Sequence, residues 1–166
     1  MLKVVYITNQ NVYGGGESNL LDVIKNSNQI YDITLITTSF LENYFKEFCK
    51  VIVYKFPKKC FIKGKVIVKE CSSLVKFLDK FDIIHIYSLD VLPLISIHKK
   101  KIILTIHGHW EIIQNSKQIF IKENSAFQTL VSKSVQRKSS FYSSNSSIVY
   151  LGKDFLKVQN IKSNST

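Results

Sequence analysis

Short apolar runs alternate along the chain with stretches whose apolar residues recur at helical spacing. The apolar runs predict strands at 2–8, 32–37, 51–54, 82–87, 101–106, 127–131 and 147–151. The helical spacing predicts helices at 17–25, 40–48 and 66–80, and a short helix or turn at 89–97. Strands that are apolar throughout and alternate with helices are typical of parallel sheets covered on both faces. We therefore expect an α/β, Rossmann-like domain with a mostly parallel sheet of about six or seven strands and helices on both faces.

The length of 166 residues fits one domain. We expect that domain to span 1–158, followed at 159–166 by a polar tail or the start of an interdomain linker. No apolar run is long enough to span a bilayer, and the N-terminus lacks the features of a secretory signal. We therefore expect a cytoplasmic protein.

The net charge of +11 comes almost entirely from lysine, since Arg137 is the only arginine. Lysines suit general attraction to anionic surfaces, whereas recognition of bases favours the planar fork of arginine. We therefore expect no nucleic-acid partner. The three cysteines are odd in number and form no C-x-x-C pair, which predicts buried, inert thiols.

A glycine cluster, Gly14, Gly15 and Gly16, lies between the first predicted strand and the first predicted helix and is followed by Glu17. Backbone without Cβ atoms lets a ligand approach closely, and N–H groups at a helix start favour an anion such as phosphate. The spacing fits neither G-x-G-x-x-G nor a P-loop. We predict that this loop binds ligand, because ligands of such sheets bind at the carboxyl ends of strands.

A second polar element, His107 to Glu111, follows the fifth predicted strand. His107 and Gly108 lie at another strand carboxyl end, so the imidazole is expected to face the same cleft. His107, His109 and Glu111 alternate as strand-borne metal ligands do, but no further cluster supports a metal, and we predict none.

His85 lies inside an apolar strand and is expected to be a hydrogen-bonded core residue. At 54–69, six lysines alternate with residues such as Phe56, Phe61 and Ile62. This segment is either a solvated loop or a contact with an anionic membrane surface through Lys58, Lys59, Lys63 and Lys65 with Phe61.

The order of these motifs resembles the N-terminal domain of family 4 retaining glycosyltransferases, which have the GT-B fold of two facing Rossmann-like domains. The similar elements, in chain order, are Gly14-Gly15-Gly16-Glu17, Asp82-Ile83-Ile84-His85, Thr105-Ile106-His107-Gly108, Val131-Ser132 and the segment from Ile148 to Asp154. The resemblance covers roughly residues 2 to 156. Tyr150-Leu151 stands where the family has Pro-Asn, so no role is carried over to Gly152 or Asp154.

The resemblance implies that the Gly14–Gly16 loop faces the donor diphosphate and that His107, as the catalytic residue, lies near the reacting sugar. Gly14, Gly15, Gly16, Glu17 and Gly108 would line the site of a nucleotide-sugar, which serves as co-substrate, with no other cofactor. The family's Glu-(seven residues)-Glu motif of the donor-binding domain is absent, since no two of the six glutamates are eight apart.

We therefore expect the acceptor-side half of a glycosyltransferase, with little turnover by itself. It would depend on a C-terminal donor-binding domain or a partner chain and act on an unknown acceptor. The alternative is a non-catalytic domain that reuses the fold to bind phosphate or, peripherally, an anionic membrane surface.

Overall fold

The computed structural model describes residues 1–68, 70–138 and 145–149. Within these residues the main sheet has seven strands in the order β3-β2-β1-β6-β7-β8-β9, and every neighbouring pair is parallel. The strands are β1 (Lys3–Ile7), β2 (Asp32–Thr37), β3 (Lys50–Val53), β6 (Ile83–Ile86), β7 (Ile102–Ile106), β8 (Phe127–Leu130) and β9 (Ser146–Ile148). The predicted mostly parallel sheet is therefore confirmed.

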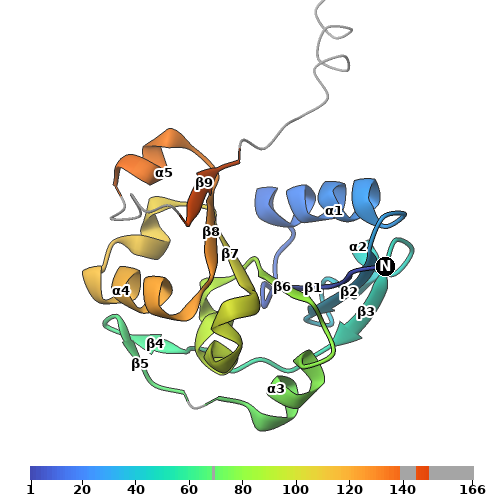
Figure 1. The fold of residues 1–166 in the computed structure, drawn as a ribbon, viewed down its shortest axis with the longest axis horizontal. Coiled ribbons are helices and arrows are strands. Elements are labelled where there is room, and N and C mark those ends of the chain that lie inside the picture. Colours follow the sequence, from blue (N-terminus) through green and yellow to red (C-terminus); the bar gives the residue numbers. More distant parts are fainter. Residues whose placement is uncertain (69, 139–144, 150–166) are drawn as a thin grey trace, which may run out of the picture.

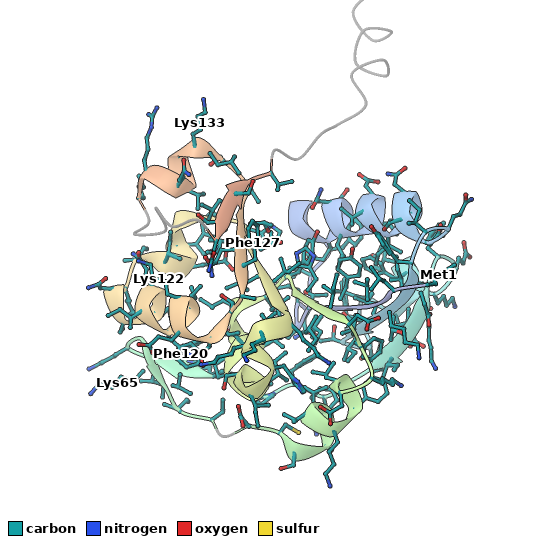
Figure 2. All side chains as sticks on the ribbon, in the orientation of Figure 1. Met1, Lys65, Phe120, Lys122, Phe127 and Lys133 are labelled. Carbon is teal, nitrogen blue, oxygen red and sulfur yellow. The ribbon has the colours of Figure 1, made fainter. Side chains whose placement is uncertain are left out.

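Helices cover both faces of the sheet, as expected (Figure 1). The α-helices are α1 (Gly15–Ser27), α2 (Glu42–Phe45), α3 (Ser72–Leu78), α4 (Asn115–Asn124) and α5 (Lys133–Arg137), and the 3₁₀ helices are η1 (Leu89–Leu94), η2 (Ser96–Lys101) and η3 (His109–Ile112). Figure 1 shows α1 on one side of the sheet, with α3 and α4 on the other.

Two buried apolar clusters form the core, one on each face of the sheet. One cluster contains Leu20 and Ile24 of α1 and Phe45 of α2, and the other contains Leu78 of α3 and Ile121 of α4. Strand residues divide between the two clusters because successive side chains of a strand point to opposite faces. Apolar runs without polar alternation are therefore what this sheet requires.

The chain changes direction across the sheet beside β1. From β1 it proceeds through β2 to the edge strand β3, and then returns to place β6 on the other side of β1. The helices on the two flanks of this switch lie on opposite faces, so a crevice opens at the carboxyl ends of β1 and β6. This crevice is where the predicted site residues belong.

The predicted helix at 66–80 is wrong in its first part. Lys63 and Gly64 have positive φ angles of 48° and 77° and form a tight turn between β4 (Phe61–Ile62) and β5 (Lys65–Val66). The turn pairs Phe61 with Val66 in an antiparallel hairpin, which takes Val66 out of the helix. The helix therefore begins only at Ser72.

Other predicted elements differ mainly in their ends. The helix predicted at 40–48 is reduced to α2, and α4 and α5 were not predicted. The region predicted as a short helix or turn forms η1, with Pro93 inside it. Gly152, Asp154 and the boundary expected between 158 and 159 lie outside the described residues. Among the residues that are described, no helix is both long and apolar enough to cross a membrane.

The three thiols differ more than the sequence suggested. Cys60 is buried, whereas Cys49 and Cys71 are partly exposed. The Sγ atom of Cys71 lies 3.0 Å from the hydroxyl of Tyr54 and 3.3 Å from that of Ser73. These hydrogen bonds, that with Ser73 first, lower the pKa of Cys71 to about 7, so this thiol departs from the inert group we expected.

Candidate functional site

The carboxyl ends of β1, β6 and β7 are neighbours because β6 lies between the other two strands. Thr8 and Ser88 follow β1 and β6, and their buried hydroxyl oxygens are 3.0 Å apart. The Asn9 N–H group also donates to the Ser88 hydroxyl oxygen, at 3.3 Å. The loops that leave these two strands are thus tied together beneath the crevice.

The predicted glycine loop forms the start of α1. Gly14 is the N-cap residue, and its N–H group donates a 3.1 Å hydrogen bond to Oε2 of Glu17. Glu17 is buried, whereas Gly14 and Gly15 are exposed. A carboxylate near a helix start stabilises the positive end of the helix dipole, so Glu17 holds the loop in place from beneath.

The fold itself does not require glycine at these three positions. None of them has a positive φ, since Lys63 and Gly64 are the only described residues that do. A Cβ atom at Gly15 would meet nothing within 4 Å, and the nearest atom to a Cβ at Gly14 or Gly16 would be at 3.5 or 3.4 Å. These are ordinary contact distances. A Cβ at Gly14 would lie against Glu17 and one at Gly16 against His107, whereas Gly15 leaves open space where a ligand can approach the backbone.

His107 lies directly beside this loop. Its Cε1 atom is 3.4 Å from the position that a Cβ atom of Gly16 would take, and the centre of its ring is 5.3 Å from that of Tyr87. Burial lowers the pKa of His107, and the carboxylate of Glu17 opposes that shift. The predicted convergence of the glycine loop and His107 on one edge of the sheet is therefore observed.

The Nε2 atom of His107 is buried and has no hydrogen-bond partner within the described part of the chain. Buried polar atoms are nearly always paired, so each exception needs a physical reason. The lowered pKa favours the neutral imidazole at pH 7. A neutral ring nitrogen can donate or accept one hydrogen bond, so Nε2 has unused hydrogen-bonding capacity beside the start of α1.

Glu111 fixes the backbone at His107 and Gly108. Its Oε2 atom accepts hydrogen bonds from the N–H groups of His107 at 2.7 Å and Gly108 at 3.2 Å. Burial nevertheless raises the pKa of Glu111 to about 7, against the effect of those two N–H groups. The sequence pattern indicated Glu111 only as a candidate metal ligand. The signal for its actual role was the Gly-x-x-Glu spacing that it shares with Gly14 and Glu17.

A polar hollow of about 220 Å³ lies beside Glu111 at the same edge of the sheet. Its lining residues come from the loops after β1, β6 and β7 and from α4, and are Asn9, Gln10, Ser88, Leu89, Asp90, Trp110, Glu111 and Lys117. The sequence does not indicate most of these residues, because they lie on segments without a periodic pattern.

An apolar hollow of about 150 Å³ lies on the α1 side of the sheet, and His85 is part of its lining. His85 Nε2 lies 2.7 Å from the Thr105 hydroxyl, which in turn is 2.7 Å from that of Thr129. Burial, and then the proximity of His107, lowers the pKa of His85 to about 4. His85 is therefore hydrogen-bonded, as the sequence predicted, and its lowered pKa keeps the imidazole neutral at pH 7.

The remaining sequence candidates have structural roles or fall outside the site. Ser132 caps α5 by accepting a 3.2 Å hydrogen bond from the N–H of Val135. Phe61 packs edge-on against Phe120 and beneath the ammonium group of Lys117, so it is not free to contact a membrane. Throughout residues 1–68, 70–138 and 145–149, no three His, Cys, Asp or Glu residues gather as metal ligands would.

No protein-family model matches this chain, and no curated protein matches it in sequence. Solved structures do resemble it. A crystal structure of HepE from Anabaena in complex with UDP-glucose superposes with a TM-score of 0.68 at 14% identity, covering 99% of this chain and 51% of the HepE chain. A second HepE structure, in complex with UDP and glucose, gives a TM-score of 0.69 at 14% identity, covering 94% of this chain and 46% of that one.

This chain therefore spans about half the length of the HepE chains it resembles. At 14% identity the likeness shows the fold and nothing finer. The chain has the α/β, Rossmann-like fold of one half of a HepE chain.

Proposed function

We propose that this chain is the acceptor-side half of a glycosyltransferase, which transfers a sugar from a nucleotide-sugar donor to an acceptor. The observation that carries the proposal is the pairing of His107 with the glycine loop. A buried imidazole nitrogen that has no hydrogen-bond partner among the described residues lies beside a helix start whose glycines the fold does not require. The fold shared with half of HepE, whose structures contain UDP-glucose or UDP and glucose, supports the same function.

The two features have different tasks in this proposal. The N–H groups at the start of α1 would face the donor diphosphate, where they stabilise the negative charge that grows as the bond to the sugar breaks. His107, neutral at pH 7 because burial lowers its pKa, would hydrogen-bond a hydroxyl of the transferred sugar. Glu17 and Glu111 would hold the backbones of the two loops in the positions that these contacts need.

A second domain, on a longer protein or a partner chain, would hold most of the donor. Positioning two reactants can lower a barrier by about 7–11 kcal/mol, and one face of an open cleft provides little of this. The isolated chain should therefore turn over slowly. Joined to its donor-binding half, it should release UDP from UDP-glucose, or the corresponding diphosphate from another donor. His107→Ala should then lower kcat more than it raises KM. Robust turnover by the isolated chain would contradict the proposal that a second domain holds most of the donor.

A second candidate function is peripheral binding of an anionic membrane surface through the hairpin of β4 and β5. Ile62, Val66 and Ile67 are exposed there, next to Lys63 and Lys65. These aliphatic side chains would replace Phe61 in the contact that the sequence suggested. Such a surface would place the protein on the cytoplasmic side of a membrane.

Co-sedimentation with phosphatidylserine vesicles tests this candidate. Neutralising both hairpin lysines, Lys63→Gln with Lys65→Gln, should weaken binding by about tenfold or more. Lys99→Gln with Lys100→Gln, on the exposed turns of η2, is the matched control. Binding that is insensitive to salt, or lost equally in both variants, would count against a hairpin contact.

A further inference from the structure

The polar hollow beside Glu111 combines an exposed aromatic ring with both hydrogen-bond donors and hydrogen-bond acceptors. Trp110 is 63% exposed, and the hollow borders it on one side. The loops after β1 and β6 contribute amide, hydroxyl and carboxylate groups, and α4 contributes Lys117. Glu111 hydrogen-bonds the backbone of His107 and Gly108. The other groups of the hollow have no role in the function proposed above.

The indole of Trp110 is held by close packing against Gly108. A Cβ atom at Gly108 would lie 2.0 Å from the indole, so only glycine allows the ring to sit where it does. The ring is thus held against the backbone while most of its surface remains exposed. A flat aromatic surface fixed at the rim of a hollow provides a stacking platform for a ring-shaped ligand.

The polar groups on the opposite wall are already ordered. The side-chain amide of Gln10 donates to the Ser88 hydroxyl oxygen at 3.3 Å, and the backbone N–H of Asn9 donates to the same oxygen. The main-chain carbonyl oxygen of Gln10 accepts a 2.7 Å hydrogen bond from the Thr38 hydroxyl. This wall therefore loses little conformational freedom when a ligand binds.

The charges around the hollow restrict the class of ligand. Asp90 and Glu111 disfavour a phosphate or other anion, and Lys117 disfavours a cation. A lipid tail would meet polar walls that it cannot satisfy. A sugar fits, because each of its hydroxyl groups both donates and accepts hydrogen bonds, and its C–H face can lie against the indole.

We propose that this hollow is the acceptor subsite and that the acceptor is a sugar, stacked on Trp110 and held by Asp90 through a charge-assisted hydrogen bond. The role of this ligand as the acceptor rests on the proposed function, whereas the binding of a sugar in this hollow does not. In the transfer, an acceptor hydroxyl oxygen bonds to the anomeric carbon of the donor and the bond from that carbon to the diphosphate breaks. The hydroxyl proton passes to the leaving diphosphate.

The position of Trp110 makes the test direct, because it is the only tryptophan in the chain. Its fluorescence therefore reports on this hollow alone. We expect D-glucose, D-mannose or N-acetylglucosamine to change the emission in a saturable way, with a Kd of about 10 mM. Asp90→Asn should weaken that binding by about tenfold, since a hydrogen bond to a charged group is lost. Asp22→Asn, an exposed carboxylate on α1 outside the hollow, should bind as the unmodified chain does.

Three results would overturn the inference: no saturable response to any of these sugars, a response to inorganic phosphate instead, or equal binding by Asp90→Asn and the unmodified chain. Glycerol should give no saturable change, because it lacks a ring face to stack on Trp110. Failure of the proposed function is a separate result, read from the backbone amides of Gly14–Gly16 with UDP-glucose. A Trp110 response without an amide response would uphold the sugar site and remove the transferase.

Discussion

The imidazole of His107 lies against Gly16, with Cε1 at 3.4 Å from the position that a Cβ atom on Gly16 would occupy. Gly16 belongs to the loop after β1 and His107 to the loop after β7, and β6 separates these strands in the sheet. The contact thus joins two loops across the width of one strand. This contact brings the two main parts of the proposed site, the glycine loop and His107, next to each other.

Gly15→Ala should separate the needs of a ligand from the needs of the fold. A Cβ atom at Gly15 meets nothing within 4 Å and the backbone has no positive φ, so the fold should accept alanine. We expect the free energy of unfolding, measured in urea, to rise by about 0.5 kcal/mol. Binding of UDP-glucose, followed by amide chemical shifts, should weaken, because the methyl group occupies the space beside the helix start. Unchanged binding would show that the ligand does not approach this loop.

Gly64→Ala should destabilise the protein, in contrast to Gly15→Ala. Gly64 has a φ of 77°, and a Cβ atom there would lie 2.3 Å from Oγ of Ser116 at the start of α4. We expect the free energy of unfolding to fall by about 1–2 kcal/mol, because an L-residue is strained in this region of backbone space. Urea denaturation of both variants under the same conditions provides the comparison. Equal stabilities would contradict the hairpin turn.

Glu111 should make stability depend on pH in a direction opposite to that of most carboxylates. Burial raises its pKa from 4.5 to about 7, so the folded protein binds more protons than the unfolded chain between these values. Its contribution is therefore fully present below about pH 4.5 and is lost as the pH rises through 7, by at most about 3 kcal/mol.

Glu111→Gln retains an oxygen that can accept from the N–H groups of His107 and Gly108 but cannot ionise. The unmodified chain should therefore lose stability relative to this variant as the pH rises from about 4.5 to 7. Exposed Glu123, changed to Gln, is the control and should show no such trend. A flat difference for Glu111→Gln would contradict the raised pKa.

Cys71 should be the first thiol to react with iodoacetamide at neutral pH. Its pKa is about 7, whereas burial raises the pKa of Cys49 and of Cys60 to about 11. Because the thiolate is the reactive form, we expect alkylation of Cys71 to be at least about a hundredfold faster. Peptide mass spectrometry over time gives the order of modification. Tyr54→Phe, which removes one hydrogen bond to the sulfur, should slow the reaction.

The sequence predicted the parts of the fold that depend on continuous apolar runs. β2 and the core of β1, β6 and β7 agree within about two residues, because strands buried on both faces need such runs. α4 was missed because its sequence, NSKQIFIKEN, buries few residues and carries little apolar pattern. The hairpin was missed because the turn is made by Lys63 as well as Gly64, and lysine gives no signal for a positive φ.

The site divides in the same way. The glycine loop and His107 were predictable because both directly follow strands, where a parallel sheet brings side chains together. The polar hollow was not predictable, since Asp90 and Trp110 lie on 3₁₀ turns, and Lys117 lies on the helix that the pattern missed. Their proximity arises from the order of the strands in the sheet, which a single sequence does not specify.

Backbone amide NMR of the chain during titration with UDP-glucose tests the central claim most directly, because it needs neither an acceptor nor a second domain. The account predicts weak binding whose shift changes are confined to Gly14–Gly16, the start of α1 and the His107–Gly108 turn, and are reduced in His107→Ala. Shift changes that are absent from both loops, or that appear only on another face of the sheet, would contradict it.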